Sequence, residues 1–277
     1  MISGRTTLIA HLGYPTETFK APMIYNPWFE SRGIDAVVVP MGVMTEDYAT
    51  FLGALFRLSN IHGALVTMPH KVTTVGMLST ASVAVQVAGS CNAILRRPDG
   101  TLHGDMFDGE GFTRGAKRKG FDFAGADCLV VGAGGVGSAI AASIAAEGPR
   151  LLALYDTRAD AVKGLAERLG RHYSGLKVEL RDNDPAGYHL VVNATPLGMQ
   201  AADPLPFDPS RLAPETFVGE VVLKTEMTPL LEAAAARGCR YLVGTDMLFE
   251  QIPAYLEFFG YGTTTPEELR EVAKISY

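Results

Sequence analysis

DCLVVGAGGVG, residues 127–137, is the segment that decides the fold of this chain. The apolar residues 128–131 are typical of a buried parallel strand, and an alanine-rich helical pattern follows the segment. Between strand and helix lie Gly132, Gly134 and Gly137, in the spacing G-x-G-x-x-G. The first glycine permits a tight turn, the second lets a pyrophosphate approach the backbone, and the third lets the helix pack on the strand. The segment therefore predicts a dinucleotide-binding turn whose phosphates face the N-terminus of the helix.

The choice between NAD and NADP depends on the turn after the next predicted strand, residues 151–155. Asp156 lies about 20 residues after the glycines, where an acidic side chain accepts hydrogen bonds from the ribose hydroxyls and repels a 2′-phosphate. This position favours NAD. Arg158 offers a guanidinium that suits a 2′-phosphate, so NADP stays the alternative. The other interpretation of Asp156 is a turn residue that caps the following helix.

Strand and helix patterns alternate along the chain, which predicts an α/β fold. In the first part we expect strands over residues 7–12, 34–39 and 64–67, a hairpin over 93–103, and helices over 21–32, 46–59 and 73–87. A helix over residues 109–119 leads into a second part, where six strand patterns with interleaved helices fit a doubly wound sheet. Two further helices, over 247–259 and 266–274, are expected after it.

Composition limits the functions open to the chain. Its 277 residues carry a net charge of −6, which argues against non-specific nucleic-acid binding. The three cysteines are far apart and match neither a zinc spacing nor a disulfide framework, so no metal is expected. The sequence shows neither an apolar run long enough to span a membrane nor a signal-peptide pattern, so a cytoplasmic location is the default expectation.

Oxidation of a hydroxyl by hydride transfer needs a group that takes the hydroxyl proton. None of the six histidines lies in a pattern typical of a dehydrogenase base. Lys71 follows a predicted strand and a proline, at a place where sheet proteins often carry functional groups. A lysine after a strand is far more often solvated than catalytic, so the local pattern alone does not assign a role to Lys71.

Six ordered segments of the chain resemble motifs of the shikimate/quinate dehydrogenase family. They are LVTMPHK at 65–71, GSCNA at 89–93, GDMFDG at 104–109, the glycine turn at 132–137, NATPLGM at 193–199 and GTDMLFEQ at 244–251. Each motif is weak alone, but together they extend over almost the whole chain in family order. The chain is thus similar to a family of two-domain oxidoreductases that use NAD(P).

The resemblance implies a role for each matching residue. Lys71 and Asp108 would be the catalytic pair at the reacting hydroxyl, where a carboxylate holds the ammonium and tunes its proton affinity. Thr67, Asn92 and Gln251 would hydrogen-bond the ring hydroxyls of the substrate. The implied cofactor contacts are Gly132, Gly134, Gly135, Val136, Gly137, Asp156, Thr157, Arg158, Thr195, Gly244 and Met247. The structural alternatives are a helix N-terminal residue for Asp108 and a turn residue for Asn92.

The resemblance also implies the domain organisation. Residues 1–112 would form a substrate-binding domain, joined by the C-terminal helices within 247–277, and residues 113–246 would form a Rossmann domain that binds NAD(P). The expected fold class is therefore α/β with two domains, the second a doubly wound sheet. The expected ligands are NAD, with NADP as the alternative cofactor, and a small cyclic hydroxy acid. A monomer or a homodimer is expected, with no nucleic-acid or membrane partner.

The chain departs from the family at the residues that contact the substrate carboxylate. Phe19 and Ala21 stand where the family has two serines, and Leu223 stands where it has a tyrosine. Met106 and Phe107 replace an asparagine and a threonine. Because a buried polar group left unpaired costs roughly 1–3 kcal/mol, the loss of three donors is expected to weaken shikimate binding by orders of magnitude.

Two explanations fit these departures. Either Thr16, Thr18 or Lys20 supplies the missing contacts, or the substrate differs at that end of the ring, which is the interpretation we favour. The sequence thus predicts a shikimate dehydrogenase-like oxidoreductase that transfers a hydride between NAD(P) and a ring hydroxyl or ketone of shikimate, quinate or a related cyclic polyol. The alternative is a ligand sensor on the same fold that binds NAD without efficient turnover. A related folate-processing dehydrogenase is disfavoured by the segment 244–251.

Overall fold

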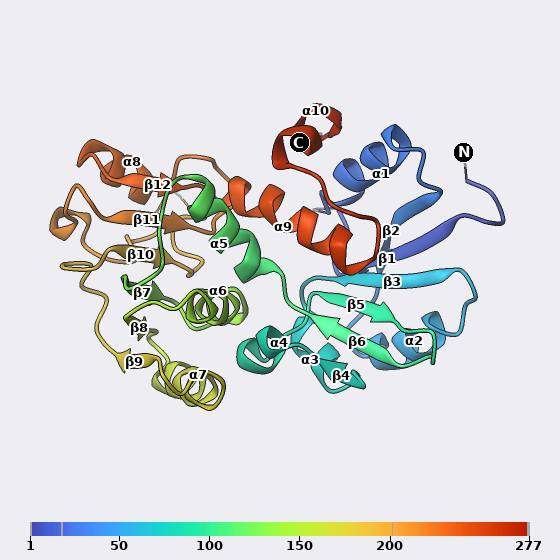
Figure 1. Ribbon diagram of the computed structural model, residues 1–277, viewed down its shortest axis with the longest axis horizontal. Coiled ribbons are helices and arrows are strands. Elements are labelled where there is room, and N and C mark those ends of the chain that lie inside the picture. The colour runs from blue at the N-terminus through green and yellow to red at the C-terminus, as the bar shows by residue number, and fades with distance from the viewer. Residues whose placement is uncertain (1, 18, 201, 276–277) are drawn as a thin grey trace. The chain divides into compact units, whose positions relative to one another are not determined.

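The computed structural model describes residues 2–17, 19–200 and 202–275. The chain divides into two compact units, each built on its own sheet (Figure 1). The first unit comprises Met1–Val85, Gly89–Phe107 and Ile252–Tyr277, and the second unit comprises Gln86–Ala88 and Asp108–Gln251. The helix that begins at Asp108 lies in the second unit, whereas the helix that begins at Gly244 passes from the second unit to the first after Gln251.

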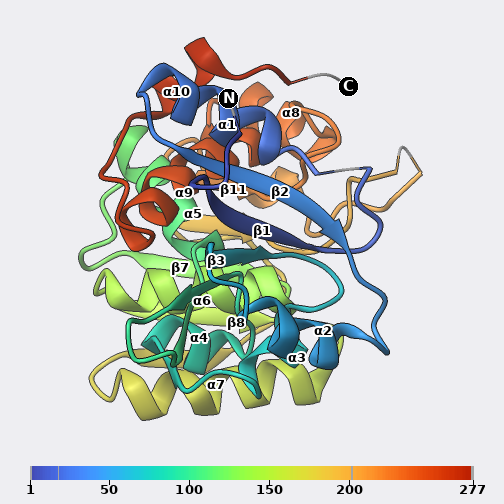
Figure 2. The same cartoon turned by 90° about the vertical axis from the view of Figure 1, so that its right-hand side faces the viewer.

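The sheet of the first unit is mixed. Its strands are β1 (Thr7–Gly13), β2 (Ala36–Gly42), β3 (Ile61–Val66), β4 (Thr80–Ala81), β5 (Ala93–Arg96) and β6 (Leu102–Asp105). Their order in the sheet is β2-β1-β3-β5-β6-β4. β1 runs parallel to both neighbours (Figure 2), whereas β5 runs antiparallel to β3 and to β6, so the predicted hairpin is confirmed.

Short helices connect these strands. They are α1 (Pro22–Ser31), α2 (Tyr48–Leu55), α3 (Lys71–Val75) and α4 (Val83–Ala88), and α10 (Pro266–Val272) follows near the C-terminus. The single helix expected over 73–87 is wrong, because the chain leaves the helical conformation after Gly76 and pairs β4 with β6. Ser82 then starts a new helix, since its extended backbone lets its hydroxyl accept the N–H of Val85 at 3.2 Å.

The second unit contains the predicted doubly wound sheet. Its strands are β7 (Asp127–Val131), β8 (Leu151–Tyr155), β9 (Lys177–Leu180), β10 (Leu190–Asn193), β11 (Phe217–Glu220) and β12 (Arg240–Leu242). They are all parallel, in the order β12-β11-β10-β7-β8-β9. Numbered in chain order and read from β9 to β12, this is the 3-2-1-4-5-6 arrangement of dinucleotide-binding sheets. The strand order reverses between β7 and β10, although the strands stay parallel.

Helices cover both faces of this sheet. They are α5 (Asp108–Arg118), α6 (Gly135–Ala146), α7 (Ala159–His172), α8 (Pro229–Ala236) and the first half of α9 (Gly244–Phe258), with a 3-10 turn η1 (Pro209–Arg211). β7 is buried along its whole length, and its alternate side chains enter two separate apolar clusters, Cys128 and Val130 in one and Leu129 and Val131 in the other. β7 is therefore the centre of the core that positions the glycine turn.

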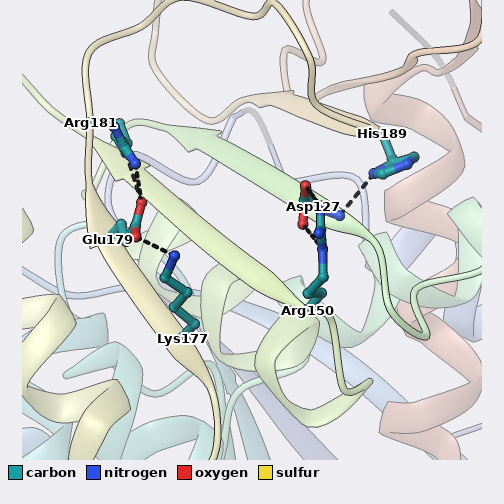
Figure 3. Close-up of polar contacts among 6 residues, drawn as sticks. All are labelled: Asp127, Arg150, Lys177, Glu179, Arg181 and His189. Carbon is teal, nitrogen blue, oxygen red and sulfur yellow. Dashed lines mark hydrogen bonds and ion pairs between the residues drawn. The ribbon is translucent and has the colours of Figure 1, made fainter.

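Charged side chains near the amino ends of the strands and on the edge strand stabilise the sheet (Figure 3). Asp127 opens β7, and its carboxylate accepts a hydrogen bond from the Arg150 guanidinium, with Nε 2.8 Å from Oδ1. Glu179 on the edge strand β9 pairs with Lys177 at 2.7 Å, a charged edge that disfavours pairing with another sheet. These carboxylates therefore have a structural role in the sheet.

In the described part of the chain the helices are too short or too polar to cross a bilayer.

Candidate active site

The glycine turn lies at the carboxyl end of β7 and has the geometry that the motif requires. Gly132 has a φ of +113°, and a Cβ atom there would lie 2.6 Å from the carbonyl oxygen of Ala194. A Cβ at Gly137 would lie 2.0 Å from the carbonyl oxygen of Gly132. Both distances are shorter than any side chain tolerates, so only glycine lets β7 turn and lets α6 pack on it.

The N-terminus of α6 is open to a ligand. Gly134 precedes the helix in an extended conformation, and the nearest atom to a Cβ built there is Arg158 Nη2 at 3.9 Å. Gly135 is exposed and Val136 is half-buried. The first N–H groups of a helix have no partner within the helix, and they carry the positive end of its dipole. This cradle fits the pyrophosphate of a dinucleotide.

Asp156 links the glycine turn to the turn after β8. Its Oδ2 accepts the N–H of Ala133 at 2.7 Å, and its Oδ1 accepts the N–H of Arg158 at 2.8 Å. The guanidinium of Arg158 also pairs with the carboxylate, at 3.1 Å and 3.2 Å. Partial burial raises the pKa of Asp156, but the hydrogen bonds from Arg158 and Ala133 and the positive charge of Arg158 outweigh it, so the pKa lies below its ordinary value.

The structural alternative for Asp156 as a helix cap is not supported. The N-cap of α7 is Arg158, and it makes no side-chain cap hydrogen bond. Thr157 and Arg158 are both exposed. Asp156 is therefore an ionised carboxylate at the edge of the glycine turn, where an adenosine ribose would lie in a dinucleotide-binding sheet.

A buried carboxylate joins the loops at the ends of β10 and β11. Glu220 is fully buried and accepts hydrogen bonds from Asn193 Nδ2 at 3.0 Å, from the N–H of Val221 at 2.8 Å and from Thr228 Oγ1 at 3.0 Å. Asn193 Oδ1 in turn accepts the Thr195 hydroxyl at 2.7 Å. The network fixes Thr195 at the carboxyl edge of the sheet, next to the glycine turn. Sequence reasoning did not find this network, because its members are distant along the chain.

Burial raises the pKa of Glu220, although the hydrogen bonds from Asn193, Val222, Val221 and Thr228 act in the opposite direction. The loop that follows β11 carries Leu223, whose side chain is 48% exposed. It also carries Val222, whose carbonyl oxygen lies 2.2 Å from where a Cβ of Gly244 would be.

The helices α5 and α9 bring Asp108 and Gln251 to adjoining turns. Asp108 is the buried first residue of α5, which agrees with a carboxylate at the positive end of a helix. Gly111, one turn later, packs so closely that its Cβ would lie 2.6 Å from the Met247 carbonyl oxygen and 2.7 Å from Gln251 Cβ. Gln251 Oε1 is buried and has no hydrogen-bond partner. This amide therefore keeps an acceptor for a ligand hydroxyl.

In the first unit, the ends of β1 and β3 bring Phe19 and Thr67 together over Gly13. A Cβ at Gly13 would lie 2.4 Å from Thr67 Cγ2 and 2.7 Å from Phe19 Cζ. Thr67 therefore turns its methyl group toward the strand, which leaves its hydroxyl on the other side of Cβ. Phe19 is buried and Ala21 is half-buried at the start of α1.

Lys71 and Asn92 are held next to each other in the first unit. Lys71 is half-buried at the start of α3, and its carbonyl oxygen accepts the N–H of Cys91 at 2.9 Å. Asn92 is buried just before β5, and its Oδ1 accepts the N–H of Phe107 at 2.9 Å, which orients the amide. Its carbonyl oxygen accepts the N–H of Val66 on β3. Asn92 therefore links β3 to the segment at Phe107, in addition to any role in a turn.

Sequence reasoning missed His11. It lies on β1, is 8% exposed and stacks on Phe19, with ring centroids 4.1 Å apart. Burial, followed by the positive charge of Lys71, lowers the pKa of His11 to about 4. Its position two residues before Gly13, on the same face of the strand, is the signal that could have found it.

A surface hollow of the first unit lies elsewhere. It measures about 690 Å³ and is lined by residues of the β5–β6 hairpin and of α9, among them His62, Arg96 and Phe258. The Arg96 guanidinium already donates to the carbonyl oxygens of Phe56 and Leu58, and the His62 ring bonds to the Phe259 carbonyl oxygen. Its polar groups are satisfied within the protein, so we do not assign a ligand to it. No cluster of metal ligands occurs among the residues described.

A two-unit α/β architecture with a dinucleotide cradle defines a class of nicotinamide-dependent oxidoreductases. Residues 12–94 match the family model described as "Shikimate dehydrogenase substrate binding domain". The shikimate dehydrogenase (NADP(+)) of Acidiphilium cryptum is 33% identical over 94% of this chain and 93% of its own. The chain therefore belongs to the shikimate dehydrogenase family.

Solved structures agree with this assignment. The shikimate 5-dehydrogenase of Listeria monocytogenes, in complex with shikimate and NAD, superposes with a TM-score of 0.91 at 26% identity, over 98% of this chain and 97% of that one. The quinate dehydrogenase of Corynebacterium glutamicum, in complex with NAD, gives a TM-score of 0.86 at 28% identity, over 96% and 98% of the chains.

Proposed function

We propose that this protein is a shikimate dehydrogenase-like oxidoreductase that transfers a hydride between NAD(P) and a ring hydroxyl or ketone of a cyclic polyol such as shikimate or quinate. The observation that carries the proposal is the complete glycine cradle, with its turn at Gly132 and open helix N-terminus, in a chain of this family. When bound, the nicotinamide supplies the hydride acceptor for oxidation of the alcohol.

Lys71 is the proton-transfer group in this proposal. As the hydride leaves the carbinol carbon, Lys71 takes the hydroxyl proton and passes it to solvent. Asp108 holds the ammonium form of Lys71 in place, and the pairing of these two residues remains a prediction from the family motifs. Thr67, Asn92 and Gln251 orient the substrate through its other hydroxyls. The unpaired Oε1 of Gln251 supports that role, since a buried acceptor gains a partner when a hydroxyl binds.

We infer a preference for NAD over NADP. The Asp156 carboxylate repels a 2′-phosphate, and the Arg158 guanidinium that would attract one is already paired with that carboxylate. Several relatives are named as NADP(+) enzymes, so the inferred preference for NAD rests on this pair of side chains alone. Gly134, Gly135, Val136 and Thr157 surround the cofactor in this proposal, and Thr195, Gly244 and Met247 lie on its nicotinamide side.

The direct test is a spectrophotometric assay of cofactor reduction with shikimate, quinate and uncharged cyclic polyols, each with NAD and with NADP. We expect turnover with at least one polyol and higher kcat/KM with NAD. Tight NAD binding without turnover on any member of the panel would favour a ligand sensor on the same fold. We prefer the enzyme because Lys71, Asp108 and Gln251 are all retained, and a sensor needs no proton-transfer group.

A further inference from the structure

His11 occupies the end of the substrate site where the family motifs are lost. It shares a face of β1 with Gly13, because alternate residues of a strand point the same way. The Cβ direction of Gly13 meets Thr67 and Phe19, and His11, on the same face of β1, stacks on Phe19.

Phe19 and His11 form one wall. Their rings stack with centroids 4.1 Å apart and planes inclined by 30°, so the phenyl ring that replaces a serine covers the imidazole. Nδ1 of His11 is buried and has no hydrogen-bond partner. A buried nitrogen of this kind is uncommon in native proteins, and it is available to a polar group of the substrate.

The side chains of the wall itself give a carboxylate neither a charge nor a hydroxyl donor. Burial and the nearby Lys71 charge lower the pKa of His11 to about 4, so the imidazole is neutral at neutral pH and adds no positive charge. Ala21 offers no hydroxyl, and the Thr16 methyl group packs toward Gly42 of β2, 3.2 Å from where a Cβ would be. Thr18 lies outside the described residues. A carboxylate against Phe19 would lose its hydration without gaining the donors that replace it.

We propose that His11 is a specificity-determining residue, and that the substrate group bound against His11 and Phe19 is an uncharged hydroxyl or hydroxymethyl group instead of a carboxylate. The inference rests on the proposed function, since it concerns the substrate of the same site. It names the substrate class as a neutral polyol or its ketone. His11 Nδ1 makes a hydrogen bond to the hydroxyl, and the Phe19 ring packs on the carbon that carries it.

Calorimetric titration tests the inference without requiring turnover. The probes are shikimate and the alcohol in which a hydroxymethyl group replaces its carboxylate, each titrated into the full chain saturated with NAD. We expect the alcohol to bind at least about tenfold more tightly, because one buried unpaired partner costs about that factor. Equal or tighter binding of shikimate overturns the inference. Loss of turnover with retained binding of the alcohol would overturn only the proposed function.

Variants of His11 separate hydrogen bonding from packing. His11→Asn places a polar atom near the position of Nδ1 and should keep the affinity for the alcohol within about threefold, whereas His11→Leu should weaken it about tenfold or more. The NAD affinity and the melting temperature of each variant report whether the fold is intact. Equal affinity for the alcohol in the Leu and Asn variants, with both folded, would remove His11 from recognition.

Restoring the two family serines at positions 19 and 21 tests the role of the Phe19 side of this wall. The double variant Phe19→Ser with Ala21→Ser restores the two family hydroxyls and should raise shikimate affinity by about tenfold while lowering that for the alcohol. The rival explanation assigns carboxylate binding to Lys20. If the wild-type protein binds shikimate more tightly and Lys20→Met abolishes that binding, the rival explanation is correct and ours is wrong.

Discussion

At the scale of single residues, the cofactor preference depends on one side-chain pair. Asp156 is bound to the glycine turn through Ala133 and to Arg158 through two ion-paired contacts. The same arginine that suits a 2′-phosphate is therefore engaged by the carboxylate that repels one. Removing the carboxylate both relieves the repulsion and releases the guanidinium.

We predict that Asp156→Ala raises the ratio of kcat/KM for NADP to that for NAD by about tenfold or more, since a like-charge contact typically costs at least about 1.4 kcal/mol. Steady-state kinetics with both cofactors measure the ratio. Asp160→Ala is the matched control, because it removes an exposed carboxylate from the first turn of α7. A ratio that Asp156→Ala leaves unchanged would show that this carboxylate does not select the cofactor.

At the scale of elements, the contact of α5 with α9 depends on a missing side chain. Gly111→Ala places a methyl group 2.6 Å from the Met247 carbonyl oxygen, so the helices must separate and the free energy of unfolding should fall by about 1–3 kcal/mol. The methyl group of Gly170→Ala in α7 meets no atom within 4 Å, so this substitution should raise the free energy of unfolding by about 0.5–1 kcal/mol. Urea unfolding measures both. Equal effects of the two substitutions would contradict the packing described for α5.

The Glu220 network makes stability depend on pH. The folded protein holds a proton on Glu220 more tightly than the unfolded chain does, because burial raises the pKa above its ordinary value of 4.5. Between these two pKa values the folded state binds more protons, so stability falls as pH rises through this window and the loss persists above it. Each tenfold difference in proton affinity corresponds to about 1.4 kcal/mol.

Glu220→Gln should remove this contribution, so the stability of the wild type relative to the variant should fall as pH rises from about 4.5. Chemical unfolding across that range measures the slope, which is independent of the packing cost of the substitution itself. Glu215→Gln, at an exposed position of the same unit, controls for the loss of a negative charge. Parallel pH profiles for wild type and Glu220→Gln would show that this carboxyl is not perturbed.

Sequence reasoning succeeded where a local pattern has one structural solution. The glycine spacing at 132–137 requires a strand, a tight turn and a helix, and the structure has all three. The helix predicted over residues 73–87 is wrong, because Gly76 and the Ser82 cap divide the segment and many of its residues are poor helix formers. Sequence reasoning also failed for His11, because a histidine in an apolar strand acquires meaning only when Phe19 packs on it in three dimensions.

At the scale of the whole molecule, the proposal divides the chemistry between the two units. The second unit carries the cradle together with Asp108 and Gln251, and the first unit carries Lys71 together with the altered wall of His11 and Phe19. A substitution at Lys71 or in the wall should therefore change turnover or substrate choice and spare the cradle. This separation is the central claim, because it explains how family members can exchange substrates while keeping one cofactor site.

The Lys71→Ala variant tests that claim most directly, by its turnover and its NAD affinity measured on one preparation. We predict that kcat falls by about 10²–10⁴ on the best polyol of the panel, while the Kd for NAD stays within about twofold of the wild type. Turnover that persists undiminished in Lys71→Ala, or NAD affinity that is lost together with turnover in a folded variant, would contradict the account.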